Sequence, residues 1–326
     1  MRVLNLRDLN KLLPKVAVCV AMRNEEAVIL NLVQSLVAQT YPNYHVFVID
    51  DHSDDESVRV VSSFEASNFK VLQAKDGVAG KAACLHQLTK GLTLDYDVLA
   101  FTDADCVVDS FWVENMVKHL KTNDLVADET LVNGKGFLPV FEKIEYREIF
   151  GLVRLLGRLS SLPSMMGNNF AIRHTLFKSV DGYESLTDSI VEDVDLLKLV
   201  NAKGAKTVMA GDCKVCTTTT NNDWNALVSQ RYRWSKGVQF NIGFLFIGLF
   251  LTSFKLVPYV FLLFNPVVGI VFFAVRWLIT FCFSPIKFRE IWSVIFFDLY
   301  QVILYVNVVL ASKQRLVDWQ GRKIKF

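Results

Sequence analysis

Residues 96–105 read YDVLAFTDAD, and this stretch decides the fold that we expect. Tyr96 to Thr102 is mostly apolar and predicts a short buried strand that ends at Asp103. Residues two apart on an extended backbone point the same way, so the carboxylates of Asp103 and Asp105 should converge on one point. Two hard oxygen ligands of this kind suit Mg2+ or Mn2+. The alternative is a solvated loop that carries two acids by chance.

Strand-like and helix-like segments alternate around this stretch. Apolar runs predict strands at Val16 to Val20, Val46 to Ile49 and Phe69 to Gln73. Helical periodicity predicts helices near residues 27–39 and 57–65 and another that opens at Lys81. This alternation is typical of an α/β fold with a mostly parallel sheet, and such sheets bind ligands beyond the carboxyl ends of their strands.

Two common nucleotide-binding loops are absent from the sequence. No glycine follows the first strand, which argues against a dinucleotide-binding fold, and Gly80-Lys81 is followed by Ala82 instead of Ser or Thr. The strand ends offer acids instead, which can accept hydrogen bonds from a ribose or a base edge. Lys81 could meet a phosphate at the start of its helix, although a solvated first-turn lysine is the alternative.

Further along, the sequence predicts a helix at 110–120, a strand at Leu125 to Val132 and a long amphipathic helix at Val140 to Leu159. Glu192-Asp193 opens another helix, where first-turn acids also suit the helix dipole. In the helix predicted for Trp224 to Phe240, Gln230 shares a face with Arg233 and Trp234. Anchoring of Arg and Trp at a lipid interface is the alternative explanation of this segment.

The composition changes near residue 237. From Val238 to Leu310 the chain is dominated by Phe, Leu, Val and Ile, which predicts a membrane-embedded part. Leu256 to Phe283 and Ile291 to Leu310 are each long enough to span, whereas Asn241 to Thr252 is short. We therefore expect a catalytic domain over residues 1–237, membrane helices over 238–311 and a basic cytoplasmic tail over 312–326.

Charge and cysteine usage narrow the function classes. The formal net charge is +2, which gives no reason to expect a nucleic-acid partner. Cys213 and Cys216 have metal-ligand spacing but lack a second pair, so we expect reduced thiols. Met1 to Pro14 lacks the apolar core of a signal peptide.

Four motifs occur in order: Asp51, Asp103-Ala104-Asp105, Glu192-Asp193 and Gln230-Arg231-Tyr232-Arg233-Trp234. Together they resemble family 2 glycosyltransferases of the GT-A fold, the group with cellulose, chitin and hyaluronan synthases and ceramide glucosyltransferase. The resemblance covers about Lys15 to Gly237 and continues into the apolar region.

The resemblance implies roles for the matching residues. On the donor side, Glu25 and Asp51 would hold the uracil or ribose of a nucleotide sugar, and Lys81 would approach the diphosphate. Asp103 and Asp105 would place Mg2+ or Mn2+ there, and Gln230 and Arg233 would steady the leaving group. On the acceptor side, Asp193 would be the general base, and Glu192 and Trp234 would contact the acceptor.

The resemblance therefore implies an inverting glycosyltransferase that uses a UDP-sugar. The expected membrane part, with few membrane helices, favours a single transfer to a lipid or lipid-linked acceptor. We expect an integral protein of the inner or plasma membrane with a cytoplasmic catalytic domain. A processive polysaccharide synthase is the first alternative. A non-catalytic membrane protein that binds sugar nucleotides is the second, although binding alone needs no base at Asp193.

Overall fold

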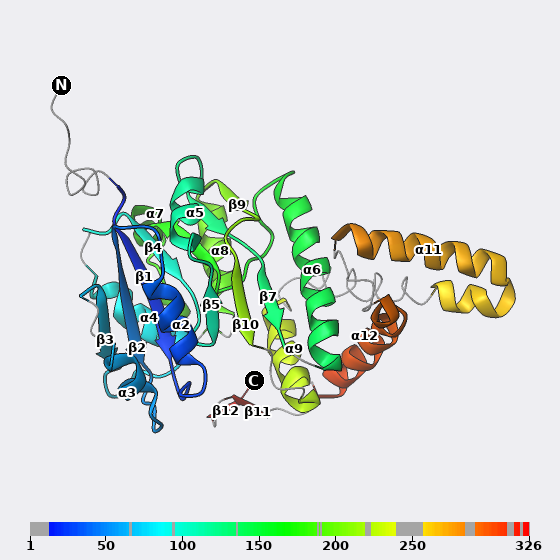
Figure 1. Cartoon of the computed structure of the whole chain (residues 1–326), viewed down its shortest axis with the longest axis horizontal. Coiled ribbons are helices and arrows are strands. Elements are labelled where there is room, and N and C mark those ends of the chain that lie inside the picture. The colour runs from blue at the N-terminus through cyan, green and yellow to red at the C-terminus, as the bar shows by residue number, and fades with distance from the viewer. Residues whose placement is uncertain are drawn as a thin grey trace. The chain divides into compact units, whose positions relative to one another are not determined.

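The structure is a computed structural model that describes residues 13–64, 67–92, 95–134, 136–187, 189, 191–218, 223–238, 257–283, 291–311, 316–319 and 322–325. The chain divides into two compact units. Figure 1 labels the helices and strands of the chain. The first unit comprises Met1–Leu131 and Leu152–Thr218, and the second comprises Val132–Gly151 and Thr219–Phe326.

A seven-stranded sheet forms the centre of the first unit, with the strand order β3-β2-β1-β4-β8-β6-β9. Neighbouring strands pair in parallel except at β8, which is antiparallel to both β4 and β6. The predicted α/β fold with a mostly parallel sheet is thus confirmed. The strands are β1 (Val16–Met22), β2 (Tyr44–Asp50), β3 (Phe69–Gln73), β4 (Val98–Phe101), β6 (Leu125–Ala127), β8 (Phe170–Arg173) and β9 (Thr207–Met209).

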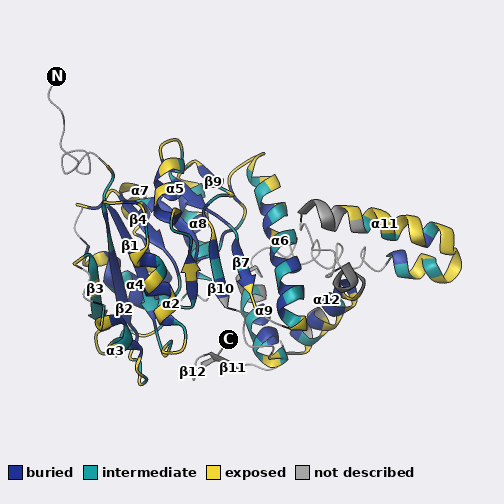
Figure 2. Ribbon diagram, viewed as in Figure 1, coloured by how far each residue is buried: buried dark blue, intermediate teal, exposed yellow. Residues whose placement is uncertain are grey.

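Helices cover this sheet, and its central strands are buried along their length (Figure 2). Burial on both faces explains why β1 and β4 are continuous apolar runs without alternation. Trp112 is fully buried in the same core. The helices are α2 (Ile29–Val37), α3 (Ser57–Ser62), α4 (Lys81–Lys90), α5 (Trp112–His119), α7 (His174–Ser179), a 3-10 turn (Glu184–Leu186) and α8 (Glu192–Ala202).

Two predicted strands differ from the structure. The strand before Asp103 ends at Phe101, and Asp103-Ala104-Asp105 forms a turn instead of extended backbone. The stretch predicted as one strand from Leu125 to Val132 breaks after Ala127 and resumes as β7 (Thr130–Asn133). Both breaks occur because the chain leaves the large sheet for a three-stranded sheet of order β5-β10-β7, with β5 (Cys106–Val108) antiparallel to β10 (Val215–Thr218).

The second unit is mainly helical. Its helices are residues 137–151 of α6 (Phe137–Gly157), α9 (Trp224–Val238), α11 (Pro266–Phe283) and α12 (Ile291–Ala311). Phe141 of α6, Tyr232 of α9 and Tyr300 of α12 belong to one buried cluster. The basic tail forms an antiparallel hairpin of β11 (Leu316–Trp319) and β12 (Arg322–Lys325).

The chain turns at Asn265, within the stretch Leu256 to Phe283 that the sequence predicts to be long enough to span a membrane. Residues 257–264 are helical, and a second helix, α11, begins at Pro266. Proline is favoured at the first position of a helix. The rings of Phe261 and Phe272 stack, with their centroids 5.3 Å apart, and the centroids of the Tyr259 and Phe273 rings are 5.5 Å apart. Residues 257–283 therefore form a helical hairpin.

In the described part of the chain, no helix is both long enough and apolar enough to cross a membrane. The predicted membrane-spanning segments are not confirmed. The short apolar segment Asn241 to Thr252 lies outside the described residues.

Candidate active site

The candidate site lies at the edge of the first unit's sheet where β2 and β4 end. Asp51 follows β2, and its carboxylate accepts a hydrogen bond of 2.9 Å from the backbone N–H of Gly80. Gly80 has φ +94°, a conformation that glycine adopts without strain. This bond fixes the loop before α4, so Asp51 sets where the backbone of Lys81 begins its helix.

The side chain of Lys81 connects two of the four sequence motifs. Its Nζ lies 2.7 Å from Asp103 Oδ1 and 3.2 Å from Glu192 Oε1. The side chain is 22% exposed. Burial lowers the pKa of Lys81, but the facing carboxylates of Asp103 and Glu192 outweigh burial and raise it well above its usual value. Lys81 is therefore a charged ammonium within a ring of acids.

Asp193 lies beside this ammonium at the start of α8. Its Oδ2 accepts a hydrogen bond of 2.7 Å from the backbone N–H of Gly167, and its Oδ1 accepts one of 2.8 Å from that of Val194. Burial and the charge of Glu192 raise the pKa of Asp193 to about 7, whereas Lys81 and the two N–H groups oppose the rise. A carboxylate that titrates near neutral pH is suited to general base catalysis.

The D-x-D motif forms a turn in which the N–H of Cys106 donates to the carbonyl of Asp103 at 3.1 Å. Asp105 Oδ2 accepts a hydrogen bond of 3.0 Å from the hydroxyl of Thr217 on β10. Burial and the nearby charge of Asp103 raise the pKa of Asp105, so the two carboxylates lie close enough to interact. Two adjacent acids with hard oxygen atoms fit Mg2+ or Mn2+.

Glu25 lies in the loop after β1 and is half-buried, and its backbone N–H donates to the Ser57 hydroxyl at 2.7 Å. The structure brings Lys81, Asp103, Glu192 and Asp193 together in the first unit. It places Gln230, Arg233 and Trp234 on α9, in the second unit.

Arg231, for which the sequence suggested only anchoring at a lipid interface, is buried and organises the α9 motif within the second unit. Its guanidinium lies 2.8 Å from Glu145 and 3.5 Å from Glu142, both on α6. It also lies 4.2 Å from the centre of the Trp234 ring and donates a hydrogen bond to the side-chain oxygen of Gln230. Burial lowers the pKa of Arg231, but Glu145 outweighs burial and raises it. The only sequence signal was the i, i+3 spacing of the two acids.

Gly167 is a second residue that the sequence analysis missed. A Cβ at this position would lie 3.1 Å from Asp193 Cβ and 3.2 Å from Lys81 Nζ. The absence of a side chain therefore lets the backbone approach both charged groups. The sequence offered no signal beyond a glycine before the strand at 170–173.

His119, Asp212 and Cys213 form a separate group with potential metal-ligand atoms in the described part of the chain. His119 Nε2 lies 2.6 Å from Asp212 Oδ1, and Lys118 also contacts this carboxylate. Burial and the charges of Asp128 and Asp212 raise the pKa of the Cys213 thiol, which disfavours a thiolate ligand. These residues are better explained as a link between α5 and the loop before β10.

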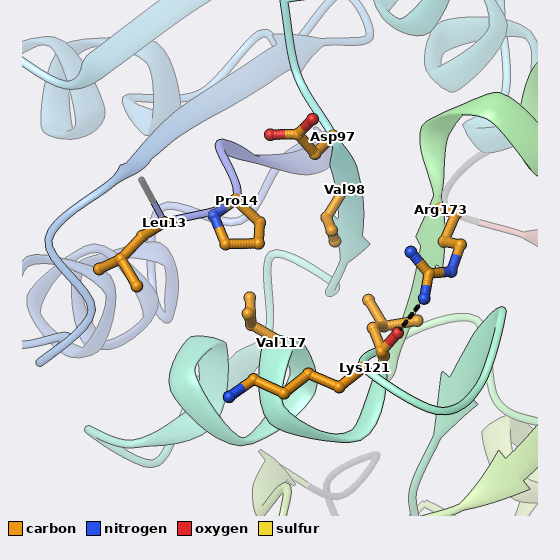
Figure 3. Close-up of a pocket in the computed structure, with 8 residues that line it drawn as sticks. Leu13, Pro14, Asp97, Val98, Val117, Lys121 and Arg173 are labelled. Carbon is orange, nitrogen blue, oxygen red and sulfur yellow. Dashed lines mark hydrogen bonds between the residues drawn. The ribbon is translucent and has the colours of Figure 1, made fainter. Parts of the chain in front are cut away.

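A cavity of 490 Å³ lies at the start of β4, opposite the end that leads to Asp103 (Figure 3). Arg173 lines this cavity and donates a hydrogen bond to the carbonyl of Leu120, another lining residue. The other lining residues are Leu13, Pro14, Asp97, Val98, Val117 and Lys121. This cavity contains none of the predicted site residues.

Residues 14–237 match the family described as "Glycosyltransferase like family 2". The chain belongs to this family. Staphylococcus aureus poly-beta-1,6-N-acetyl-D-glucosamine synthase is 25% identical over 225 residues, which are 67% of this chain and 53% of the relative. Beta-monoglucosyldiacylglycerol synthase of Trichormus variabilis is 28% identical over 202 residues, which are 58% of this chain and 42% of the relative. The chain thus spans about half the length of these curated relatives.

The fold also resembles a solved structure. The mannosyltransferase PcManGT from Pyrobaculum calidifontis, in complex with GDP-Man and Mn2+, superposes with a TM-score of 0.57 at 16% identity. The match covers 91% of this chain and 87% of that one. The chain accordingly combines membership of this family with a GT-A-like fold.

Proposed function

We propose that this glycosyltransferase is metal-dependent and inverting, and that it transfers a sugar from a nucleoside diphosphate sugar to a lipid or lipid-linked acceptor at a membrane. UDP is the expected nucleotide. The observation that carries the proposal is the position of Asp193, whose raised pKa suits a base, beside a lysine that also contacts the D-x-D motif.

In the proposed reaction, Asp193 removes the proton from an acceptor hydroxyl while that oxygen forms a bond to the anomeric carbon. The bond from this carbon to the nucleoside diphosphate breaks, and the diphosphate leaves with the electron pair. A single displacement inverts the anomeric configuration. General base assistance of this kind contributes roughly 10²–10⁴ in rate.

Asp103 and Asp105 are the residues that would hold Mg2+ or Mn2+. The metal would supply positive charge to the departing diphosphate, and Lys81 would add a second positive charge. The GDP-Man and Mn2+ bound by PcManGT support a metal and a nucleotide sugar, and they make GDP-mannose a second donor to test.

Membrane attachment is supported by the surface of the helical hairpin 257–283. Leu263 is 84% exposed, Phe264 83% and Val267 72%. Such a concentration of exposed apolar side chains is costly in water and typical of helices that lie in a membrane interface. The hairpin continues this surface with Val260, Phe261, Ile270, Val271, Phe272, Val275 and Leu278.

A lipid acceptor agrees with this surface and with the similarity to the glucosyldiacylglycerol synthase. We propose attachment to the inner or plasma membrane with the catalytic unit in the cytoplasm, where nucleotide sugars occur. A polysaccharide synthase is the second candidate function, favoured by the similarity to the poly-N-acetylglucosamine synthase.

The proposal is tested by nucleotide release from the detergent-purified chain with Mn2+, UDP-sugars or GDP-mannose, and membrane lipid extract. We expect lipid-dependent release with one donor, and its loss in Asp193→Asn. Asp195→Asn is the matched control, because Asp195 lies on the same helix but contacts Ser189 and Lys198. A ladder of long products would favour the polysaccharide synthase, and nucleotide binding without release would contradict a transferase.

Membrane attachment has its own test, flotation of the chain with liposomes. The double variant Leu263→Glu/Phe264→Glu should lose flotation, whereas Leu159→Glu should keep it. Leu159 is 80% exposed but lies outside the hairpin. Equal flotation of the two variants would refute the hairpin as the attachment surface.

A further inference from the structure

We infer that Lys81 is the resident cation of the D-x-D site in the donor-free protein, and that a divalent metal must displace it from Asp103. The nucleotide diphosphate then receives the displaced ammonium. This inference rests on the proposed function. It adds that the affinity for the metal depends on the nucleotide, so the metal should bind weakly until the nucleotide is present.

The contact between Lys81 and Asp103 is direct. A separation of 2.7 Å between Nζ and Oδ1 is that of a charge-assisted hydrogen bond, among the strongest that side chains form. The same carboxylate belongs to the pair that would hold the metal. A metal ion and the ammonium compete for this oxygen atom, so metal binding at Asp103 requires the loss of a partly buried ion pair.

The surroundings hold Lys81 in this position. Glu192 contacts the ammonium from α8, and the backbone at Gly167 runs so close that a Cβ there would lie 3.2 Å from the same nitrogen atom. Asp193 also favours the charged form of the lysine. Acids collected in a partly buried site repel one another unless a cation is present, and the ammonium supplies that charge in the free protein.

After a metal has displaced it from Asp103, the Lys81 ammonium can pair with the nucleotide diphosphate. Its backbone is fixed at the start of α4 by the bond from Gly80 to Asp51, while its side chain is long and has rotatable bonds. A diphosphate at this helix start offers new anionic partners. The nucleotide therefore compensates for the contact that the metal removes, and by linkage each ligand strengthens the binding of the other.

The test is the affinity for Mn2+ alone, measured by electron paramagnetic resonance of the free ion with the purified full chain, and its change on adding UDP or GDP. Lys81→Met should bind Mn2+ about tenfold more tightly than wild type without nucleotide, since one lost ion pair is of the order of tenfold in affinity. The increase in Mn2+ affinity that nucleotide gives should shrink in this variant. Complex formation between Mn2+ and the nucleotide in solution is measured separately and is common to all variants.

Two further variants serve as controls. Lys81→Arg keeps the positive charge and should keep weak metal binding and strong coupling. Lys198→Met removes a lysine that pairs with Asp195, and it should leave both quantities unchanged. If Lys81→Met fails to fold, Lys81→Gln replaces it, because its amide can still donate hydrogen bonds to the two acids.

The inference would be overturned if wild type and the folded Lys81 variant had equal Mn2+ affinity while metal and nucleotide still bound together. The proposed function would then remain intact. Mn2+ affinity in wild type that does not change with nucleotide would overturn the inference as well. Absence of metal binding in every protein, even with UDP or GDP, would contradict the metal assignment in the proposed function and the inference with it.

Discussion

The backbone N–H of Gly167 donates a hydrogen bond of 2.7 Å to Asp193 Oδ2, so the proposed base is oriented by a residue that has no side chain. Gly167→Ala should reduce turnover at least tenfold. The added methyl would lie 3.2 Å from Asp193 Oδ2, closer than ordinary van der Waals contact, and would displace this carboxylate or Lys81. Nucleotide release and thermal unfolding measure the two effects.

Gly91→Ala is the matched control for that variant. A Cβ at residue 91 would meet its nearest neighbours at 3.4 and 3.6 Å, which are ordinary contacts. This variant should keep both turnover and melting temperature. Full activity of Gly167→Ala would show that the close approach at Gly167 does not matter for the reaction.

The activity should depend on pH through Asp193. The raised pKa of about 7 means that the carboxyl is largely protonated below pH 7 and cannot accept a proton there. We expect kcat/KM to fall about tenfold per pH unit below a midpoint near 7. Glu192→Gln removes a charge that raises this pKa, so it should move the midpoint to lower pH.

Asp195→Asn should leave the midpoint in place, since Asp195 pairs with Lys198. A midpoint that does not move in Glu192→Gln would argue that another group limits the activity at low pH.

Arg231→Met should destabilise the second unit by about 3–5 kcal/mol, because it leaves two buried carboxylates without their cation. Glu142 is 5% exposed and Glu145 3%. Denaturant unfolding measures the loss. Lys198→Met breaks an exposed pair, 51% and 32% exposed, and should change the stability little.

Arg231→Lys separates the charge from the geometry of the guanidinium. Lysine can pair with Glu145 but cannot make the planar contact with Trp234. We expect a smaller loss of stability than in Arg231→Met, together with reduced activity. Equal loss in both variants would show that the planar group matters more than its charge.

Asp128→Ala should cost about 3 kcal/mol of stability. Asp128 is 2% exposed and accepts hydrogen bonds from the backbone N–H groups of Gly211 and Cys213 and from Arg154. Removal of the carboxylate takes this acceptor from the two backbone N–H groups and leaves Arg154 with only the longer contact of 3.9 Å to Glu129. Thermal unfolding should show a clear loss relative to Glu114→Ala, an exposed control. Similar melting temperatures for the two variants would contradict this role.

Much of the first unit follows from local sequence. The strand at Phe69–Gln73 and the helix start at Lys81 fall where hydrophobic pattern and the Gly80 turn predict them. The break at Asp128 could not be predicted this way. The acid lies in an apolar run, and the backbone N–H groups that it binds, those of Gly211 and Cys213, are distant in the sequence.

The sequence motifs predicted which residues belong to the candidate site, but not which of their side chains contact one another. The sequence indicates that Asp103 and Glu192 matter, but an ion pair of both with Lys81 depends on how three distant segments meet. The extended backbone predicted for the D-x-D motif was wrong for a related reason. Whether Asp103 continues a strand or starts a turn depends on the second sheet, which pairs residues 106–108 with 215–217.

The division of the chain has a practical consequence for protein production. The second unit takes residues 132–151 from the middle of the chain, and within it Phe141 and Ile144 pack with side chains of α9 and α12. A shortened protein that stops at residue 218 would retain this middle segment without its helical partners. Its apolar face and the acids Glu142 and Glu145 would be open to solvent and to aggregation, so a soluble fragment needs an internal replacement of residues 132–151 as well as a new end.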